Sequence, residues 1–114
     1  MAVSFEAIGE KYVTFLKGSG AAEGEVCKLT ANRTVGACAE DDAFCGVVSQ
    51  IRGNLAAVTL SGYAEVSYSG STAPTVGYSL LSADGEGGVA VNEDGKAYLV
   101  VSVDTTNKMI GLFL

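Results

Sequence analysis

Three cysteines, Cys27, Cys38 and Cys45, are the residues of this sequence whose chemistry could support catalysis or metal binding. The chain contains no histidine, which removes the commonest general base, the commonest metal ligand and the usual Cys-His pairing. Cys45 stands inside the apolar run 44–48, where burial would raise the pKa of its thiol, so we predict a small core residue. No Cys-x-x-Cys pair is present, and zinc would need a carboxylate as its fourth ligand. We therefore predict a protein that is not an enzyme and holds no metal.

The acidic residues cluster in turn-forming stretches, at 40–42, 84–86 and 93–94. None of these clusters has the Asp-x-Asp-x-Asp spacing of a calcium loop, so we favour solvent-exposed loop tips over a calcium site. The glycine-rich stretch 18–24 superficially resembles a dinucleotide-binding loop, but a strand pattern follows it instead of the helix that such a loop requires. A cleft for paired-carboxylate glycoside hydrolysis would also be hard to build in so small a chain. We predict no cofactor.

The charge balance of the chain is acidic, with a net charge of −6, a pI of about 4.4 and 7 scattered basic residues. Nucleic-acid binding needs clustered Lys and Arg against the phosphates, so we expect no nucleic-acid partner. No window holds the roughly 18 consecutive apolar residues of a membrane helix, so we expect no membrane partner either. An odd number of cysteines suits a reducing compartment, and we expect a soluble protein made in the cytosol.

Short alternating runs of apolar and polar residues, broken by Gly, Ser, Asn and Asp, predict an all-β fold. We expect a small barrel or sandwich of about eight to ten short strands with an extended N-terminal arm. A length of 114 residues fits a single domain, which we divide into an N-terminal arm and first strand, 1–23, and a β-barrel domain, 24–114. The strands are expected near residues 11–17, 26–29, 34–37, 44–48, 55–61, 63–69, 78–81, 89–91, 98–103 and 109–114.

The two halves of the sequence contain similar short segments in the same order. Three pairs of segments correspond: 24–29 with 77–81, 34–35 with 89–91, and 44–48 with 109–113. Each half ends with the five-residue pattern apolar-x-Gly-apolar-apolar, in which x is any residue. The second half carries an extra long strand at 97–103, so a duplication and a coincidence in a β-rich chain both stay open.

Several stretches of strand-forming sequence carry a further signal: GEVCKL at 24–29, FCGVV at 44–48, VTLSGYAEV at 58–66, and the closing elements at 77–81 and 110–112. Together they span about residues 24–114. They resemble the small β-rich capsid decoration, or cement, proteins that are encoded beside the major capsid gene of tailed bacteriophages and prophages.

This resemblance implies a phage or prophage structural protein that binds and stabilises the capsid shell on the virion surface. The implied partner is the major capsid protein, and the implied oligomer is a homotrimer without catalytic activity. A rigid barrel presents a fixed surface, and an N-terminal arm can add a strand to a partner by β-augmentation. The interface candidates are therefore Val3, Phe5, Ile8 and Tyr12.

Alternatives stay open for the function. Another phage structural component, such as a head-fibre or tail protein, would share this composition and fold. A small-ligand or carbohydrate-binding β-barrel would need a concave face on which Tyr or Asn side chains converge. Five tyrosines lie in predicted strands, where most are expected to cover the core and one or two to face a partner.

Overall fold

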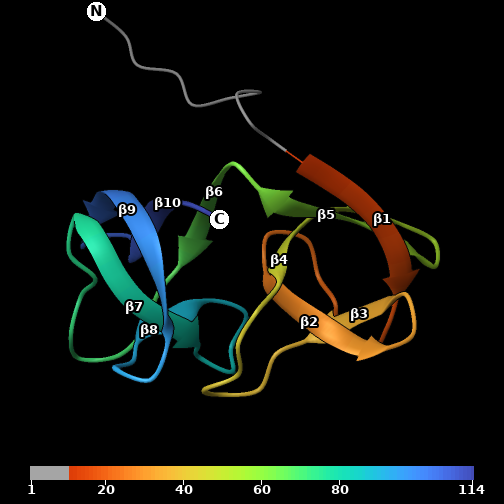
Figure 1. The fold of residues 1–114 in the computed structure, drawn as a ribbon, viewed down its shortest axis with the longest axis horizontal. Helices are drawn as coiled ribbons and strands as arrows, with labels where there is room; N and C mark the ends of the chain where they lie inside the picture. Colours follow the sequence, from red (N-terminus) through yellow and green to blue (C-terminus); the bar gives the residue numbers. More distant parts are fainter. Residues whose placement is uncertain (1–10) are drawn as a thin grey trace, which may run out of the picture.

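The computed structural model describes residues 11–114, and these residues form ten β-strands and no helix (Figure 1). The prediction of an all-β chain with about eight to ten short strands is confirmed, whereas the expected arm lies outside the described residues. In chain order the strands are β1 (Lys11–Lys17), β2 (Val26–Ala31), β3 (Thr34–Ala37), β4 (Gly46–Arg52), β5 (Leu55–Ser61), β6 (Tyr63–Ser67), β7 (Gly77–Ala83), β8 (Val89–Val91), β9 (Lys96–Asp104) and β10 (Met109–Phe113).

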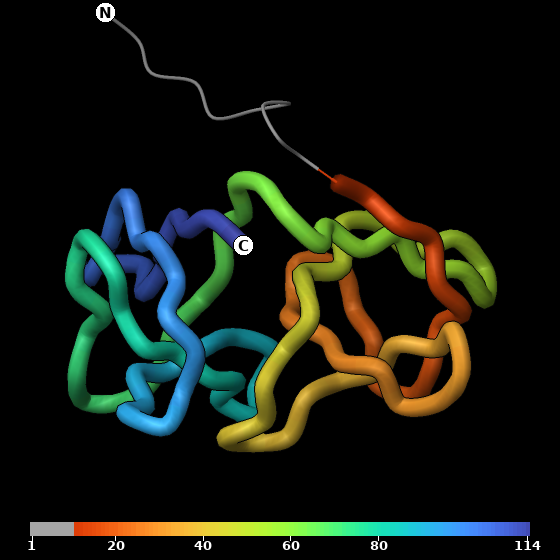
Figure 2. Tube along the Cα trace, viewed as in Figure 1, coloured from red at the N-terminus to blue at the C-terminus, as the bar shows by residue number. Residues whose placement is uncertain are grey.

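The ten strands divide into two groups of five that follow each other along the chain (Figure 2). The first group is a closed barrel with the strand order β1-β3-β2-β4-β5, in which β1 also pairs with β5. The second is a sheet with the order β6-β10-β9-β7-β8. Of the predicted alternatives, barrel and sandwich, the first half is therefore a barrel.

The second group repeats the pairing scheme of the first when five is added to each strand number. The antiparallel pairs β1–β5, β2–β3, β2–β4 and β4–β5 correspond to β6–β10, β7–β8, β7–β9 and β9–β10. The parallel pair β1–β3 corresponds to a single parallel bridge between Tyr68 and Val89, beside which the Ser69 N–H donates to the Val89 carbonyl at 3.0 Å. The second group is thus a less completely closed version of the first, which supports an internal duplication.

One correspondence drawn from the sequence is wrong. The run 44–48 and the run 109–113 are not equivalent, because β4 corresponds to β9 and β5 corresponds to β10. The shared glycine pattern has a local cause. A side chain at Gly46 would collide with the Thr59 carbonyl, and one at Gly111 would collide with the Tyr63 ring. Close approach, of backbone at Gly46 and of side chains at Gly111, favours glycine at both places independently of strand equivalence.

Two hydrophobic cores stabilise the fold, and β2 contributes to both. Cys27 points into the first barrel, whose interior is filled by Cys27, Val35, Val48, Ala56 and Val58. Its neighbour Val26 points the opposite way, as successive strand residues do, into a larger core. This larger core combines Val26, Cys38, Phe44 and Val47 of the first half with Val66, Tyr68, Leu81, Ala83, Val89, Tyr98, Val100, Ile110 and Leu112 of the second half.

The loop between β3 and β4 fastens the first half to the second. The Asp41 N–H donates to the Ala83 carbonyl at 2.9 Å, and the Ala83 N–H donates to the Asp42 carbonyl at 2.9 Å. Next to these bonds the Phe44 ring stacks on the Tyr98 ring, with 4.9 Å between centroids and 13° between planes. The two groups of strands therefore share a packed, hydrogen-bonded interface.

We predict that Phe44→Ala lowers the free energy of unfolding by about 3–5 kcal/mol, because it removes a buried ring and leaves a cavity against Tyr98. The measurement is urea denaturation followed by circular dichroism. Val76→Ala is the control, since Val76 is exposed and its loss should change stability by no more than about 0.5 kcal/mol. Equal stability of the two variants would contradict the role given to Phe44.

Candidate functional site

The structure separates the three cysteines. Cys27 is buried in the first barrel, Cys38 is buried in the larger core, and Cys45 is exposed; all three are free thiols. The prediction that Cys45 is a core residue is wrong, because its neighbours Phe44 and Gly46 occupy the buried positions at the start of β4. In residues 11–114, no three or more His, Cys, Asp or Glu side chains are grouped so that they could hold a metal ion.

Cys45 differs from the other two cysteines in acidity. Its backbone N–H donates to the Cys27 carbonyl at 2.8 Å, and the Cys27 thiol, which donates to the Gly46 carbonyl with 3.7 Å between sulfur and oxygen, is also within reach of the Cys45 sulfur. This thiol–thiol contact lowers the pKa of Cys45 to about 7 and, together with burial, raises the pKa of Cys27. Burial raises the pKa of Cys38 to about 11. The expected raised pKa of Cys45 is therefore wrong in direction.

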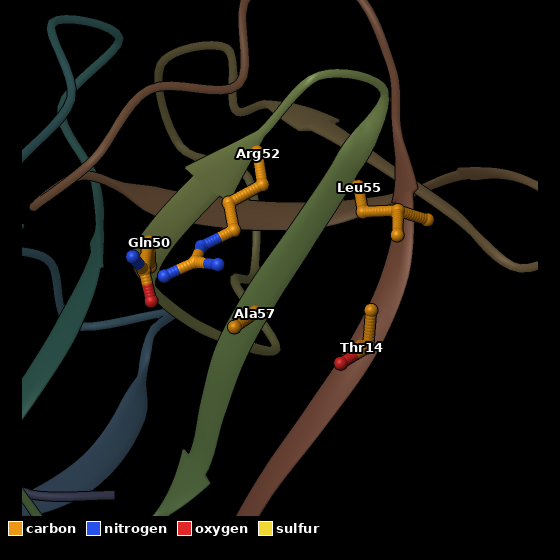
Figure 3. A pocket seen from close by; sticks show the side chains of 5 residues that line it. All are labelled: Thr14, Gln50, Arg52, Leu55 and Ala57. Carbon is orange, nitrogen blue, oxygen red and sulfur yellow. The ribbon is translucent and has the colours of Figure 1, made fainter.

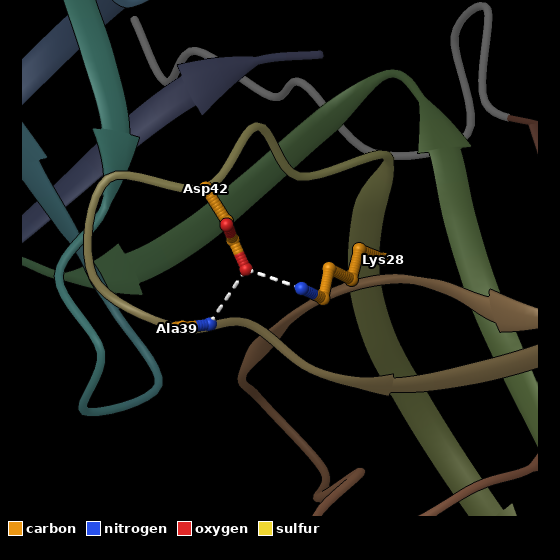
Figure 4. A network of polar contacts seen from close by, with 3 residues as sticks. All are labelled: Lys28, Ala39 and Asp42. Carbon is orange, nitrogen blue, oxygen red and sulfur yellow. Dashed lines mark hydrogen bonds and ion pairs between the residues drawn. The ribbon is translucent and has the colours of Figure 1, made fainter.

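The acidic clusters hold the loops in place. Glu40 and Asp41 are exposed, as expected, but Asp42 is half-buried and its Oδ2 lies 2.5 Å from Lys28 Nζ and 2.8 Å from the Ala39 N–H nitrogen (Figure 4). The hydrogen bond from Lys28, and then that from Ala39, lower the pKa of Asp42. Asp84 acts in the same way in its own turn, where it accepts hydrogen bonds from Ser69 Oγ and from the N–H groups of Glu86 and Gly88.

The two most exposed apolar side chains of the described residues, Tyr78 and Val76, lie on and beside β7. Tyr78 is 77% exposed and Val76 is 69% exposed, and Leu80 and Val91 are exposed as well. Tyr78, Leu80 and Val91 line a hollow of about 300 Å³ together with Thr72, Ala73 and Thr75. We call Val76, Tyr78, Leu80 and Val91 the Tyr78 face.

At the start of β7 the side chains face the opposite way from the one that the sequence pattern predicts. Alternation alone would bury the apolar Tyr78 and Leu80 and expose Ser79, yet Ser79 is buried and both apolar side chains face outward. The Ser79 hydroxyl is satisfied because it donates to the Thr75 carbonyl at 2.9 Å. Next along the strand, Leu81 fills the larger core and fixes the register. The exposure of Tyr78 and Leu80 is therefore built into the strand.

A second outer face lies on the first barrel, where β1, β4 and β5 enclose a hollow of about 210 Å³ (Figure 3). Its lining residues, which we call the Arg52 face, are Thr14, Gln50, Arg52, Leu55 and Ala57. The Arg52 side chain extends toward Gln50 across this hollow, and Leu55 lies at its other side (Figure 3). The face therefore combines a cation with an exposed leucine.

The interface candidates from the sequence are placed only in part. Tyr12 is exposed and lies near the start of β1, the strand that also carries Thr14. It pairs with Thr59 of β5. Val3, Phe5 and Ile8 lie outside the described residues. Sequence reasoning missed the Tyr78 face, because Val76, Tyr78 and Leu80 recur at every second position, and such a pattern is equally typical of inward-facing residues.

No protein-family model matches this chain, and no curated protein sequence is significantly similar to it. Within residues 11–114, no helix has the length and apolar character to cross a bilayer. The geometry of the exposed faces is accordingly the basis on which a function is proposed.

We predict that Cys45 is the fastest-reacting thiol and that its alkylation by iodoacetamide rises with pH and levels off above a midpoint of about 7. The reactive species is the thiolate, which the contact with the Cys27 thiol stabilises. Mass spectrometry of timed samples measures the rate at each cysteine. Cys45→Ser should remove the fast reaction and Cys38→Ser should leave it intact; a fast reaction that maps to Cys38 would refute the assignment.

Proposed function

We propose that this protein is a phage or prophage capsid decoration protein, which binds the major capsid protein on the outside of the head and stabilises the shell. The sequence resemblance supports the capsid role, and the inverted start of β7 supports a protein contact, because it presents Tyr78 and Leu80 to a partner while a serine occupies the interior. Large apolar side chains gain stabilisation only when they leave water, at about 25 cal/mol per Å². Tyrosine is also enriched in protein interfaces, where its ring supplies much of the contact.

The Tyr78 face is preorganised for such a contact. β7 pairs with β8 on one side and with β9 on the other, so its backbone is held from both edges. The Ser79–Thr75 hydrogen bond fixes the segment that leads into the strand. A surface that is ordered before binding loses little conformational entropy on binding, which leaves more of the contact energy for affinity.

The N-terminal arm is the second proposed contact, through Val3, Phe5 and Ile8 together with Tyr12. A shell presents the same binding site many times, so weak contacts become effective when several are made at once by a homo-oligomer, for which we propose a trimer. The proposed location is the outer surface of the virion, and no catalytic step, cofactor or metal enters this function.

Two alternatives belong to other classes of partner. A head-fibre or tail component would use the same kind of apolar face on a different phage protein. A small-ligand or carbohydrate-binding barrel is less favoured, because side chains fill the first barrel, and the hollows on the protein surface, of about 200–340 Å³, lie at the small end for ligand pockets.

We predict that Tyr78→Ser and Leu80→Ser each weaken binding to mature capsid shells by about tenfold or more, because each removes a large apolar contact. The shells are assembled from candidate major capsid proteins of the same genomic neighbourhood, and binding is measured by co-sedimentation over a concentration series. Leu29→Ser is the matched control, since Leu29 is exposed on the first barrel, away from the Tyr78 face. Unchanged binding by both β7 variants would remove the Tyr78 face from the proposed interface.

Deletion of residues 1–10 should abolish shell binding, because it removes Val3, Phe5 and Ile8, while β1 and the rest of the barrel remain. The same co-sedimentation assay gives the binding result, and circular dichroism with thermal unfolding shows whether the strands persist. If the shortened protein is folded and still binds as the full chain does, the arm has no role in the contact.

A further inference from the structure

A third outer face, on the second group of strands, is the counterpart of the Arg52 face. It is a hollow of about 340 Å³ over β6, β9 and β10. These strands correspond to β1, β4 and β5 in the repeated pairing scheme. We call its central residues, Glu65, Ser102, Asp104, Met109 and Gly111, the Asp104 face.

Register makes the two faces comparable residue by residue. Arg52 of β4 pairs with Leu55 of β5, and Asp104 of β9 pairs with Met109 of β10. Leu55 and Met109 are each the first residue of their strand, so they occupy equivalent positions, and both are exposed, at 44% and 37%. Arg52 and Asp104 are consequently equivalent as well, and they carry opposite charges.

The neighbouring positions strengthen the contrast. Thr14 pairs with Ala57 on the Arg52 face, and Glu65 pairs with Gly111 at the equivalent place on the Asp104 face. One face therefore carries a single cation, and the other carries two carboxylates. Both faces have an exposed apolar residue beside the charge, Leu55 or Met109.

The charged groups are available to a partner. Among the described residues, Arg52 has no carboxylate within ion-pair distance, the one ion pair there being Lys28–Asp42. Asp104 is held in place by hydrogen bonds from the Asn107 N–H at 3.1 Å, the Asn107 side-chain amide at 2.9 Å and the Thr106 N–H at 3.0 Å, which also lower the pKa of its carboxyl. The Glu65 carboxylate accepts a hydrogen bond from the Tyr63 hydroxyl at 2.9 Å.

We propose that the Arg52 face of one copy of this chain docks on the Asp104 face of the next copy. Arg52 then lies against Glu65 and Asp104, and Leu55 packs against Met109. Contact between two Arg52 faces, or between two Asp104 faces, would bring like charges together, which is unfavourable in a partly desolvated interface. Because each copy carries both faces, the contact is heterologous and continues from copy to copy until a ring closes.

This inference deepens the self-association part of the proposed function by naming the surfaces that form it. It uses neither the Tyr78 face nor the arm. Its test contains no capsid shell, so a failure here is distinct from a failure of shell binding.

The test is sedimentation velocity of the full chain over a range of concentrations, with Arg52→Glu and the double variant Glu65→Arg, Asp104→Asn. Asparagine keeps an oxygen that can accept the two backbone bonds from Thr106 and Asn107, and only the bond from the Asn107 side-chain amide loses its acceptor. We expect the natural protein to associate and each variant to associate at least about tenfold more weakly. The matched controls Arg33→Glu and Glu86→Arg reverse exposed charges outside both faces and should associate as the natural protein does.

Mixing the variants tests the heterologous arrangement directly. Arg52→Glu carries two acidic faces and the double variant carries two basic faces, so an equimolar mixture should recover the association that each lacks alone. Circular dichroism of each variant checks that it is folded. The proposal is overturned if the natural protein stays monomeric, if folded variants associate as it does, or if the mixture fails to recover association.

Discussion

The structure depends on the contact between its two groups of strands, and above all on the loop from Cys38 to Cys45. This loop gives two backbone hydrogen bonds to Ala83 of β7 and places Phe44 against Tyr98 of β9. A barrel of five short strands has a small interior, here filled by a few side chains. Most of the apolar burial is in the larger core, to which both groups contribute, so neither group buries its share without the other.

Asp42 links the local order of that loop to the interface. Its carboxylate binds the Lys28 ammonium and the Ala39 N–H, which holds the loop in a turn beside β2 (Figure 4). Its carbonyl accepts a hydrogen bond from the Ala83 N–H across the interface. A side chain near the surface contributes little through charge alone, because water screens it. Its effect is to fix the backbone groups that pair with β7, so that Phe44 reaches Tyr98. Since β7 also carries the Tyr78 face, the same loop supports that surface from behind.

The sequence was sufficient for the number of strands, but not for all of their bounds or for their partners, since the strand expected at 44–48 runs from Gly46 to Arg52. The bounds of β1 and β5 follow from plain alternation between glycine-rich turns, and they agree with the structure. Strand order could not be predicted, because pairing depends on contacts between residues far apart in the chain. The same limit explains Cys45 and Tyr78: a short apolar run does not reveal which of its residues face inward, and at Phe44 and Ser79 tertiary packing decides this. The acidity of Cys45 depends on Cys27, eighteen positions away, which no local pattern encodes.

An internal duplication, which the repeated pairing scheme supports, would allow equivalent surfaces to differ. When identical subunits associate through one surface, every substitution alters both sides of the contact at once, so opposite charges cannot be assigned to opposite sides. Two linked copies of a five-stranded unit remove this restriction, because Arg52 and Asp104 occupy equivalent places but are encoded separately. Arg52 and Asp104 can act together in such a contact only if the two groups of strands are held rigidly relative to each other. The shared core supplies this rigidity, since the Phe44–Tyr98 stack and the Ala83 hydrogen bonds fix the angle at which the two faces point.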